Sequence, residues 1–137
     1  MDLTLKYPRS PAESLADLVH VLRMADKARA AKEEMLGEYI YPCPLDDIIL
    51  DFLGVSAETF QKEACQRSDE ALLPWVESLC RRRSSQEIND INRKILDSRP
   101  DNPEKLKKFE SLRNKIDPAR TDIVTWVGLI DLEEGRL

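Results

Sequence analysis

The chain has 137 residues, of which 42% are apolar and 34% are charged, with a net charge of −5 and a mean hydropathy of −0.47. This length suits one domain with its own core, and the composition suits helices that each turn one face to water. No apolar run approaches the roughly 20 residues that a membrane-spanning helix needs, so we expect no membrane partner.

The N-terminus and the cysteines bear on the compartment. The first residues, MDLTLKYPRSP, lack the apolar stretch and the small-residue cleavage site of a secretory signal. Cys43, Cys65 and Cys80 are odd in number and do not have the spacing of metal ligands, and a single histidine argues against a His-based metal site. We therefore predict a cytoplasmic protein with reduced thiols, no metal and no cofactor.

Residues 10–36 are predicted to form the first helix. Ser10-Pro11-Ala12-Glu13 combines an N-cap serine, a proline at the first helical position and a glutamate that can close a capping box. Gly37 supplies a left-handed stop. The apolar stripe of this helix, continued in steps of three and four residues, reaches Asp26 and then Arg29.

The segment Glu38–Pro44, EYIYPCP, is predicted to be extended, because its Tyr-Ile-Tyr alternation and two prolines disfavour a helix. Since Gly37 ends the preceding helix, this segment should fold back near it. Pro44 then opens a second helix that continues to Leu53 and ends at Gly54.

Capping signals predict four further helices before the tail. The signals and the expected ends are Ser56 to about Gln66, Ser68 to the region of Arg81, Ser84 to Pro100, and Asn102 to Asp117. Pro74 lies too deep in its helix for the first turn and predicts a kink or a restart there. The helices at 84–98 and 103–116 carry matching narrow apolar seams, and we expect them to form a helical hairpin whose seams bury each other or lie on the bundle.

The tail, 121–137, is rich in β-branched residues, which leaves an extended edge segment as an alternative. Thr121-Asp122 resembles a cap, however, and Ile123, Trp126, Val127 and Ile130 follow at helical spacing, which predicts a helix. The expected fold is all-α, a single irregular bundle of about six helices over residues 1–137 with one extended Tyr/Pro segment at 38–44.

Six stretches together resemble the family catalogued as domain of unknown function 5069. They are YPRSP (7–11), LVHVLRMADKARA (18–30), LGEYIYPCPLD (36–46), DFLGV (51–55), SDEALLPWV (68–76) and TDIVTWVGLIDLEEGR (121–136). The resemblance spans nearly the whole chain and implies one small bacterial-type domain. It implies no particular reaction.

Asp26 and Arg29 are the first candidate site, because side chains three residues apart on a helix can touch. A buried ion pair is weak evidence of stability. One interpretation is structural, with Arg29 binding carbonyls of residues 38–43. The other is a polar pocket in which Arg29 binds an anionic ligand, Asp26 orients it and Tyr39 or Tyr41 lines the wall. The structural interpretation is favoured, because ion-pair networks mimic sites.

Cys43 is the second candidate, since its sulfur would lie at a helix N-terminus. The only imidazole, His20, falls on the polar side of the first helix with Arg23 and Lys27, away from the Asp26 stripe. A nucleophile and its base must lie within hydrogen-bond reach, so a thiol enzyme is the minority interpretation. We predict that His20, Arg23 and Lys27 form a solvated face.

The segment 81–120 is basic, with 12 lysines and arginines against 7 acidic residues, which gives +5 locally and leaves −10 for the remainder. Acids interrupt the basic residues and few aromatics accompany them, so a nucleic-acid partner is disfavoured. The favoured function is a non-enzymatic binding or interaction domain whose site joins the first helix to residues 39–46. The alternative is a small enzyme acting on an anionic metabolite through Arg29 with Asp26 or Cys43. A protein partner and a homo-oligomer stay open.

Overall fold

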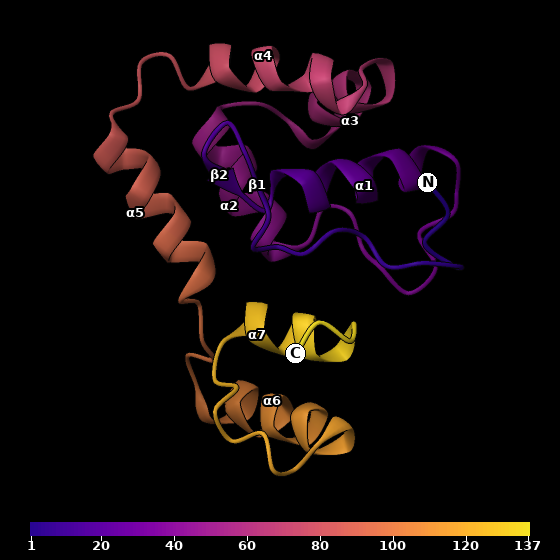
Figure 1. Cartoon of the computed structure of the whole chain (residues 1–137), viewed down its shortest axis with the longest axis vertical. Coiled ribbons are helices and arrows are strands. Elements are labelled where there is room, and N and C mark those ends of the chain that lie inside the picture. The colour runs from indigo at the N-terminus through magenta and orange to yellow at the C-terminus, as the bar shows by residue number, and fades with distance from the viewer.

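The computed structural model describes all residues, 1–137, and its architecture is mostly helical (Figure 1). The predicted all-α class is confirmed, with seven helices instead of about six. The elements are β1 (Ser14–Leu15), β2 (Leu18–Val19), α1 (Val21–Lys32), α2 (Pro44–Leu53), α3 (Ala57–Gln66), α4 (Asp69–Leu79), α5 (Ser85–Leu96), α6 (Pro103–Ile116) and α7 (Trp126–Glu133). None of the helices combines the length and apolar character that a membrane-spanning segment needs.

The first predicted helix begins later than expected, because residues 10–20 are not helical. The short strands β1 and β2 pair antiparallel, with Ser14 opposite Val19. Ala16 and Asp17 form the loop between them and both have positive φ, 53° and 63°, as a type I′ turn requires. His20 also has positive φ, 74°, and stands immediately before α1.

Contacts with distant elements stabilise this hairpin. The Asn92 side chain on α5 donates a hydrogen bond to the Asp17 carbonyl at 2.7 Å and accepts one from the Val19 N–H at 3.0 Å. The Ser10 hydroxyl caps no helix: it donates to Asp131 on α7 at 2.8 Å. The helical pattern of residues 10–20 is overridden because these partners come from α5 and α7.

The C-terminal end of α1 is also earlier than predicted. Glu34 adopts a left-handed conformation, φ 56°, and the Met35 N–H donates to the Ala30 carbonyl at 2.8 Å, which is a Schellman-type ending. Gly37 lies beyond the helix, where a Cβ atom would stand 3.1 Å from the Leu3 carbonyl oxygen. Gly37 therefore permits the close approach of the N-terminal segment.

Residues 38–43 are irregular, pair with no strand and contain a cis peptide bond between Tyr41 and Pro42, whereas Pro44 begins α2. Their expected return over α1 is confirmed, because Lys27 on α1 donates to the Ile40 carbonyl at 3.1 Å. The Tyr41 hydroxyl donates to the Ala57 carbonyl at 2.6 Å and so fastens the segment to the start of α3.

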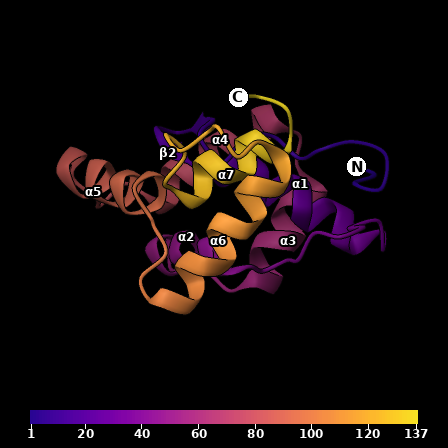
Figure 2. The same ribbon diagram turned by 90° about the horizontal axis from the view of Figure 1, so that it is seen from below.

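The predictions for α2 to α6 hold, apart from Pro74 and the hairpin. Helix α4 continues through Pro74 without a restart. Helices α5 and α6 do not form a hairpin of matched seams: α5 packs against β2, α2 and α7, whereas α6 packs against α7 (Figure 2). The tail is helical as predicted, but its N-cap is Thr125, whose hydroxyl accepts from the Gly128 N–H at 3.0 Å.

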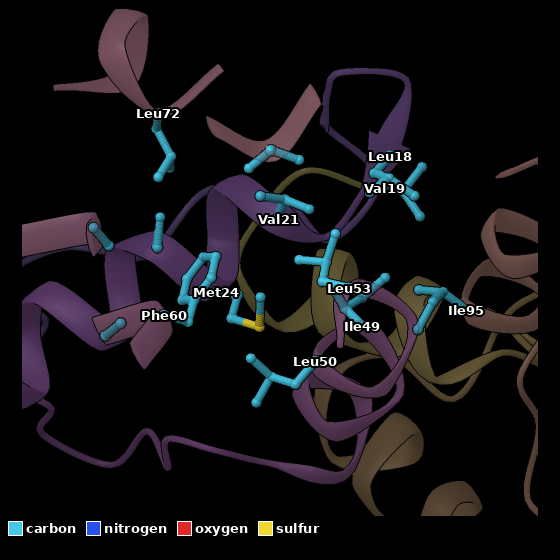
Figure 3. Close-up of a cluster of buried hydrophobic side chains, with 14 of the residues drawn as sticks. Leu18, Val19, Val21, Met24, Ile49, Leu50, Leu53, Phe60, Leu72 and Ile95 are labelled. Atoms are coloured by element: carbon cyan, nitrogen blue, oxygen red, sulfur yellow. The ribbon is translucent and has the colours of Figure 1, made fainter. Parts of the chain in front are cut away.

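Two apolar clusters lie inside the molecule. The larger surrounds α1 and contains 16 buried residues, including Met24, Ile49, Phe60 and Ile95 (Figure 3). The smaller joins α6 to α7 and consists of Phe109, Ile123, Leu129 and Leu132. Nine of the twelve α1 residues are buried, and they include charged ones, so their ionic groups need partners inside the protein.

Candidate functional site

Asp26 and Arg29 belong to an ionic network but do not pair with each other. Asp26 is fully buried and accepts three hydrogen bonds from Arg9, from the backbone N–H at 2.9 Å, Nε at 3.1 Å and Nη2 at 2.9 Å. Arg9 also reaches Asp69 at 2.7 Å, and Asp69 binds Arg29 at 2.9 Å. Hydrogen bonds from Arg9 lower the pKa of Asp69 to about 2.

The remaining donors of Arg29 bind backbone carbonyls in α3 and at the residue that follows it. They donate to the carbonyls of Ala64 at 2.9 Å and Arg67 at 3.0 Å, so the expectation that Arg29 binds carbonyls of residues 38–43 was wrong. The helical wheel of one element gave no information about which loop would lie against it. This network joins the N-terminal segment, α1 and the α3–α4 junction.

A second network contains the three residues for which a solvated face was predicted, and that prediction was wrong. His20, Arg23 and Lys27 are 1%, 4% and 3% exposed. The segment 38–44 covers this side of α1 through contacts with Lys27, and Glu134 at the end of α7 covers it through Arg23. The cover comes from residues remote in the chain, which a local pattern does not reveal.

Lys27 and Asp46 form the centre of this second network. The Lys27 ammonium uses its three donors on the Ile40 carbonyl at 3.1 Å, Cys43 Sγ at 3.1 Å and Asp46 Oδ2 at 2.7 Å. Burial alone would raise the pKa of Asp46, but the hydrogen bond from His20 and the charge of Lys27 lower it to about 2. Asp46 is therefore an anion that balances Lys27.

His20 is a neutral imidazole with one free acceptor. Its Nε2 lies 2.6 Å from Asp46 Oδ1, and because that partner is a carboxylate, the hydrogen-bond network assigns the proton to Nε2. Burial lowers the pKa of His20, which keeps the ring uncharged. Its Nδ1 is buried and has no hydrogen-bond partner. Such an orphaned acceptor is uncommon in a folded protein.

Helix α7 closes the same region through Glu134. Arg23 binds Glu134 through two parallel hydrogen bonds at 2.8 and 2.9 Å, with both side chains 5% exposed. The Tyr39 hydroxyl donates to the same carboxylate at 2.9 Å, and the Arg23 guanidinium lies 5.4 Å from the Tyr39 ring centroid. Burial and the hydrogen bond to Glu134 raise the pKa of Tyr39, so its phenol stays a donor.

These side chains border a cavity of about 580 Å³ between α1, the 38–45 segment and α7. We call it the α1–α7 pocket; its lining includes His20, Arg23, Lys27, Tyr39, Cys43 and Glu133. Of the candidate residues from the sequence, Tyr39 and Cys43 line it, whereas Asp26, Arg29 and Tyr41 do not. His20, Lys27, Asp46 and Glu134 were not among the residues predicted for a site. The lone histidine within an apolar run was the one signal that could have drawn attention to them.

The donor set His20, Cys43 and Asp46 has its ligand atoms within 4.8 Å of one another, the spacing of a metal site. His20 was predicted to lie away from Cys43 because His20 and Lys27 were both expected on one helix. His20 precedes α1, however, so that geometry does not apply. The Lys27 ammonium touches both Asp46 and Cys43, so a cation of the protein itself already fills the place of a metal ion.

The comparisons with known proteins define the class to which this small helical fold belongs. The family model described as "Domain of unknown function (DUF5069)" matches residues 5–136, and the chain belongs to this family. None of the curated proteins matches the chain.

Proposed function

We propose that the domain is a non-enzymatic binding module that takes a small polar ligand into the α1–α7 pocket. The observation that carries this proposal is the gathering of buried ionic side chains beside one open cavity. Arg23, Lys27 and Asp46 are each less than 5% exposed, and the first two line the pocket. Replacement of buried ion pairs by apolar groups is often neutral or stabilising, so folding alone does not require charges here.

The arrangement supports binding better than catalysis. An enzyme acting on an anionic metabolite would need Arg29, Asp26 and Cys43 to converge on one cavity. Asp26 and Arg29 instead bind Arg9 and Asp69, and Cys43 lies in the other network. The charge of Lys27 beside Cys43 is shared with Asp46, so the thiol does not have a dedicated cation.

The basic segment 81–120 gives less support to a nucleic-acid partner. Its cations are partly engaged with neighbouring acids, in the pairs Arg83 with Glu87, Lys105 with Asp101 and Arg120 with Asp122. A cytoplasmic location, which we also propose, is supported by the three unpaired thiols.

The proposal is tested by filling the pocket. Ile130 lines it, whereas Ile116 is 43% exposed at the end of α6, so Ile130→Trp and Ile116→Trp are matched substitutions. We expect compounds from a panel of small anions, cations and neutral polar metabolites to raise the melting temperature of the wild type and Ile116→Trp but not of Ile130→Trp. A ligand present at a concentration 100 times its dissociation constant raises the free energy of unfolding by about 2.7 kcal/mol.

Circular dichroism of both variants confirms that each is folded before the screen. The proposal is wrong if no compound in the panel discriminates between the two variants.

A further inference from the structure

We infer that the ligand of the α1–α7 pocket is an amphipathic amine, with an ammonium head group and an apolar substituent. This inference rests on the proposed function and gives its ligand class. It replaces the anionic ligand expected from Arg29.

The charges around the pocket disfavour an anion. Its two buried cations are already neutralised, Arg23 by Glu134 and Lys27 by Asp46, each at 2.7–2.9 Å. All three N–H donors of Lys27 are in use. An anionic ligand would have to displace a buried carboxylate to gain these donors, which leaves that carboxylate unpaired.

The charges without partners at the same pocket are negative. Glu38 and Glu133 line it, and neither has an ion-pair partner in the protein. Both carboxylates are exposed at the rim of the pocket. Partial burial and the neighbouring Glu134 raise the pKa of Glu133, and the charge of Arg23 opposes this shift. An ammonium group placed beside Glu133 would supply an ion-pair partner. The Tyr7 ring lines the pocket too and is 57% exposed, so its face is available to a cation.

His20 reports on the pocket without supplying a hydrogen bond to the ligand. The ring lines the pocket but is 1% exposed, and its unpartnered Nδ1 is itself buried, so a ligand in the pocket does not reach it. A charged ligand that binds here instead changes the electrostatic environment of the ring nitrogens.

The apolar part of the ligand is inferred from a neighbouring cavity of about 410 Å³. This apolar pocket shares Cys43, Leu45 and Ile130 with the α1–α7 pocket, so the two adjoin along these residues. Its other walls include Ile48 and Trp126. Its charged lining consists of the paired Lys105 and Asp101 together with Arg99. A chain that leaves the head group across Cys43 therefore enters apolar surroundings.

The test uses nuclear magnetic resonance with two homologous series as probes. Ethyl-, butyl- and hexylammonium chloride are compared with sodium acetate, butyrate and hexanoate. The chain offers internal reporters, because His20 is its only histidine, and of its two tryptophans Trp126 lines the apolar pocket whereas Trp75 packs against Phe60.

We expect the alkylammonium series to shift the His20 ring nitrogen signals. The longer members should also shift the Trp126 indole signal and leave Trp75 unchanged. Affinity should rise with chain length, by up to about fourfold for each added methylene that is buried. The carboxylates should produce neither pattern.

Matched variants separate the site from the general attraction of an acidic protein for cations. Glu133→Gln removes the unpaired carboxylate, and Glu110→Gln makes the same charge change on an exposed position of α6. We expect Glu133→Gln to weaken hexylammonium binding about two- to fivefold and Glu110→Gln to leave it unchanged, since an ion pair with an exposed carboxylate is worth about that factor.

The inference is overturned if the carboxylates shift the His20 and Trp126 signals and the ammonium compounds do not. In that case the pocket would still be a binding site, but for anions. It is also overturned if both glutamine variants bind hexylammonium equally, or if neither series shifts these signals. The proposed function fails separately, when no compound of the metabolite panel distinguishes Ile130→Trp from Ile116→Trp.

Discussion

Arg9 joins two carboxylates through one guanidinium, because it binds Asp26 of α1 and Asp69 of α4, and Asp69 in turn binds Arg29. Asp26 has no contact with water, so its charge depends on these hydrogen bonds. Loss of the Asp26 charge is costly, because a hydrogen bond to a charged group contributes more to stability than one between neutral groups.

Asp26→Asn should therefore lower the free energy of unfolding by about 1.5–3 kcal/mol, since it weakens the hydrogen bonds from Arg9, which is 30% exposed and keeps Asp69 as a partner. The matched control is Asp122→Asn, which breaks the pair of Arg120 with a 64% exposed carboxylate and should cost at most about 1 kcal/mol. Urea denaturation of the three proteins measures both. An Asp26→Asn protein as stable as the wild type would show that the charge of Asp26 does not contribute to stability.

His20 should make folding sensitive to mild acid. Burial holds its pKa below the ordinary value, so the folded chain keeps the ring neutral while the unfolded chain takes up a proton as the pH falls through about 6.5. The contribution of neutral His20 to the free energy of unfolding is therefore present above that pH. It is lost on acidification, by up to about 1.4 kcal/mol per pH unit for one proton.

The measurement is the free energy of unfolding of the wild type and of His20→Gln at pH values between 7 and 5. Because the chain has no other histidine, the variant should have a shallower slope in this window. Parallel slopes for the two proteins would contradict a neutral His20.

At the scale of elements, the sequence predicted best where the signal was local. Ser56, Ser68, Ser84 and Asn102 each accept a hydrogen bond from the third N–H of the helix that they precede, as their positions indicated. These bonds form within one turn, so no other part of the molecule decides them. The starts of α3 to α6 follow from them.

Prediction failed where a distant element supplied the partner. The β1–β2 hairpin depends on Asn92 of α5, and the burial of Lys27 depends on the segment 38–44. Tyr39 was predicted as a site residue because its segment folds back over the first helix, and Cys43 because it precedes the N-terminus of the second helix. Glu134, which fixes Tyr39 and Arg23, comes from α7 at the far end of the chain, and no local pattern connects them.

The end of α1 allows a matched test of backbone strain. Glu33 and Glu34 are adjacent, exposed and chemically identical, but φ is −96° at Glu33 and 56° at Glu34. Glu34→Gly should raise the free energy of unfolding by about 1 kcal/mol, because glycine adopts the left-handed conformation without a Cβ clash. Glu33→Gly should lower it by about 0.5–1 kcal/mol, because there glycine only adds freedom to the unfolded chain. Thermal denaturation gives both values, and effects of the same sign would contradict the left-handed ending.

At the scale of the whole molecule, the two apolar clusters divide the helices unequally. Helices α1 to α4 surround the larger cluster, whereas α6 is held mainly through Phe109, which meets Trp126 of α7 edge to face at 5.1 Å between ring centroids. Helices α5 and α7 contact each other and connect the two regions (Figure 1). We propose that residues 1–137 form one domain in which α6 is the least stable part.

This proposal predicts different outcomes for two substitutions of the same kind. Phe60 in the larger cluster is 0% exposed and Phe109 in the smaller is 1% exposed, so Phe60→Ala and Phe109→Ala each remove a buried ring. Each substitution should destabilise the cluster around it by about 3–5 kcal/mol. Phe109→Ala should speed amide hydrogen exchange in α6 and the start of α7 while protection in α1 and α3 persists, because α6 has few other buried contacts and opens locally. Phe60→Ala should speed exchange throughout, since α1 packs on α3 at the centre of the larger cluster.

Hydrogen exchange followed by mass spectrometry resolves the helices separately. Uniform loss of protection in Phe109→Ala would show instead that α6 unfolds only together with the rest of the chain.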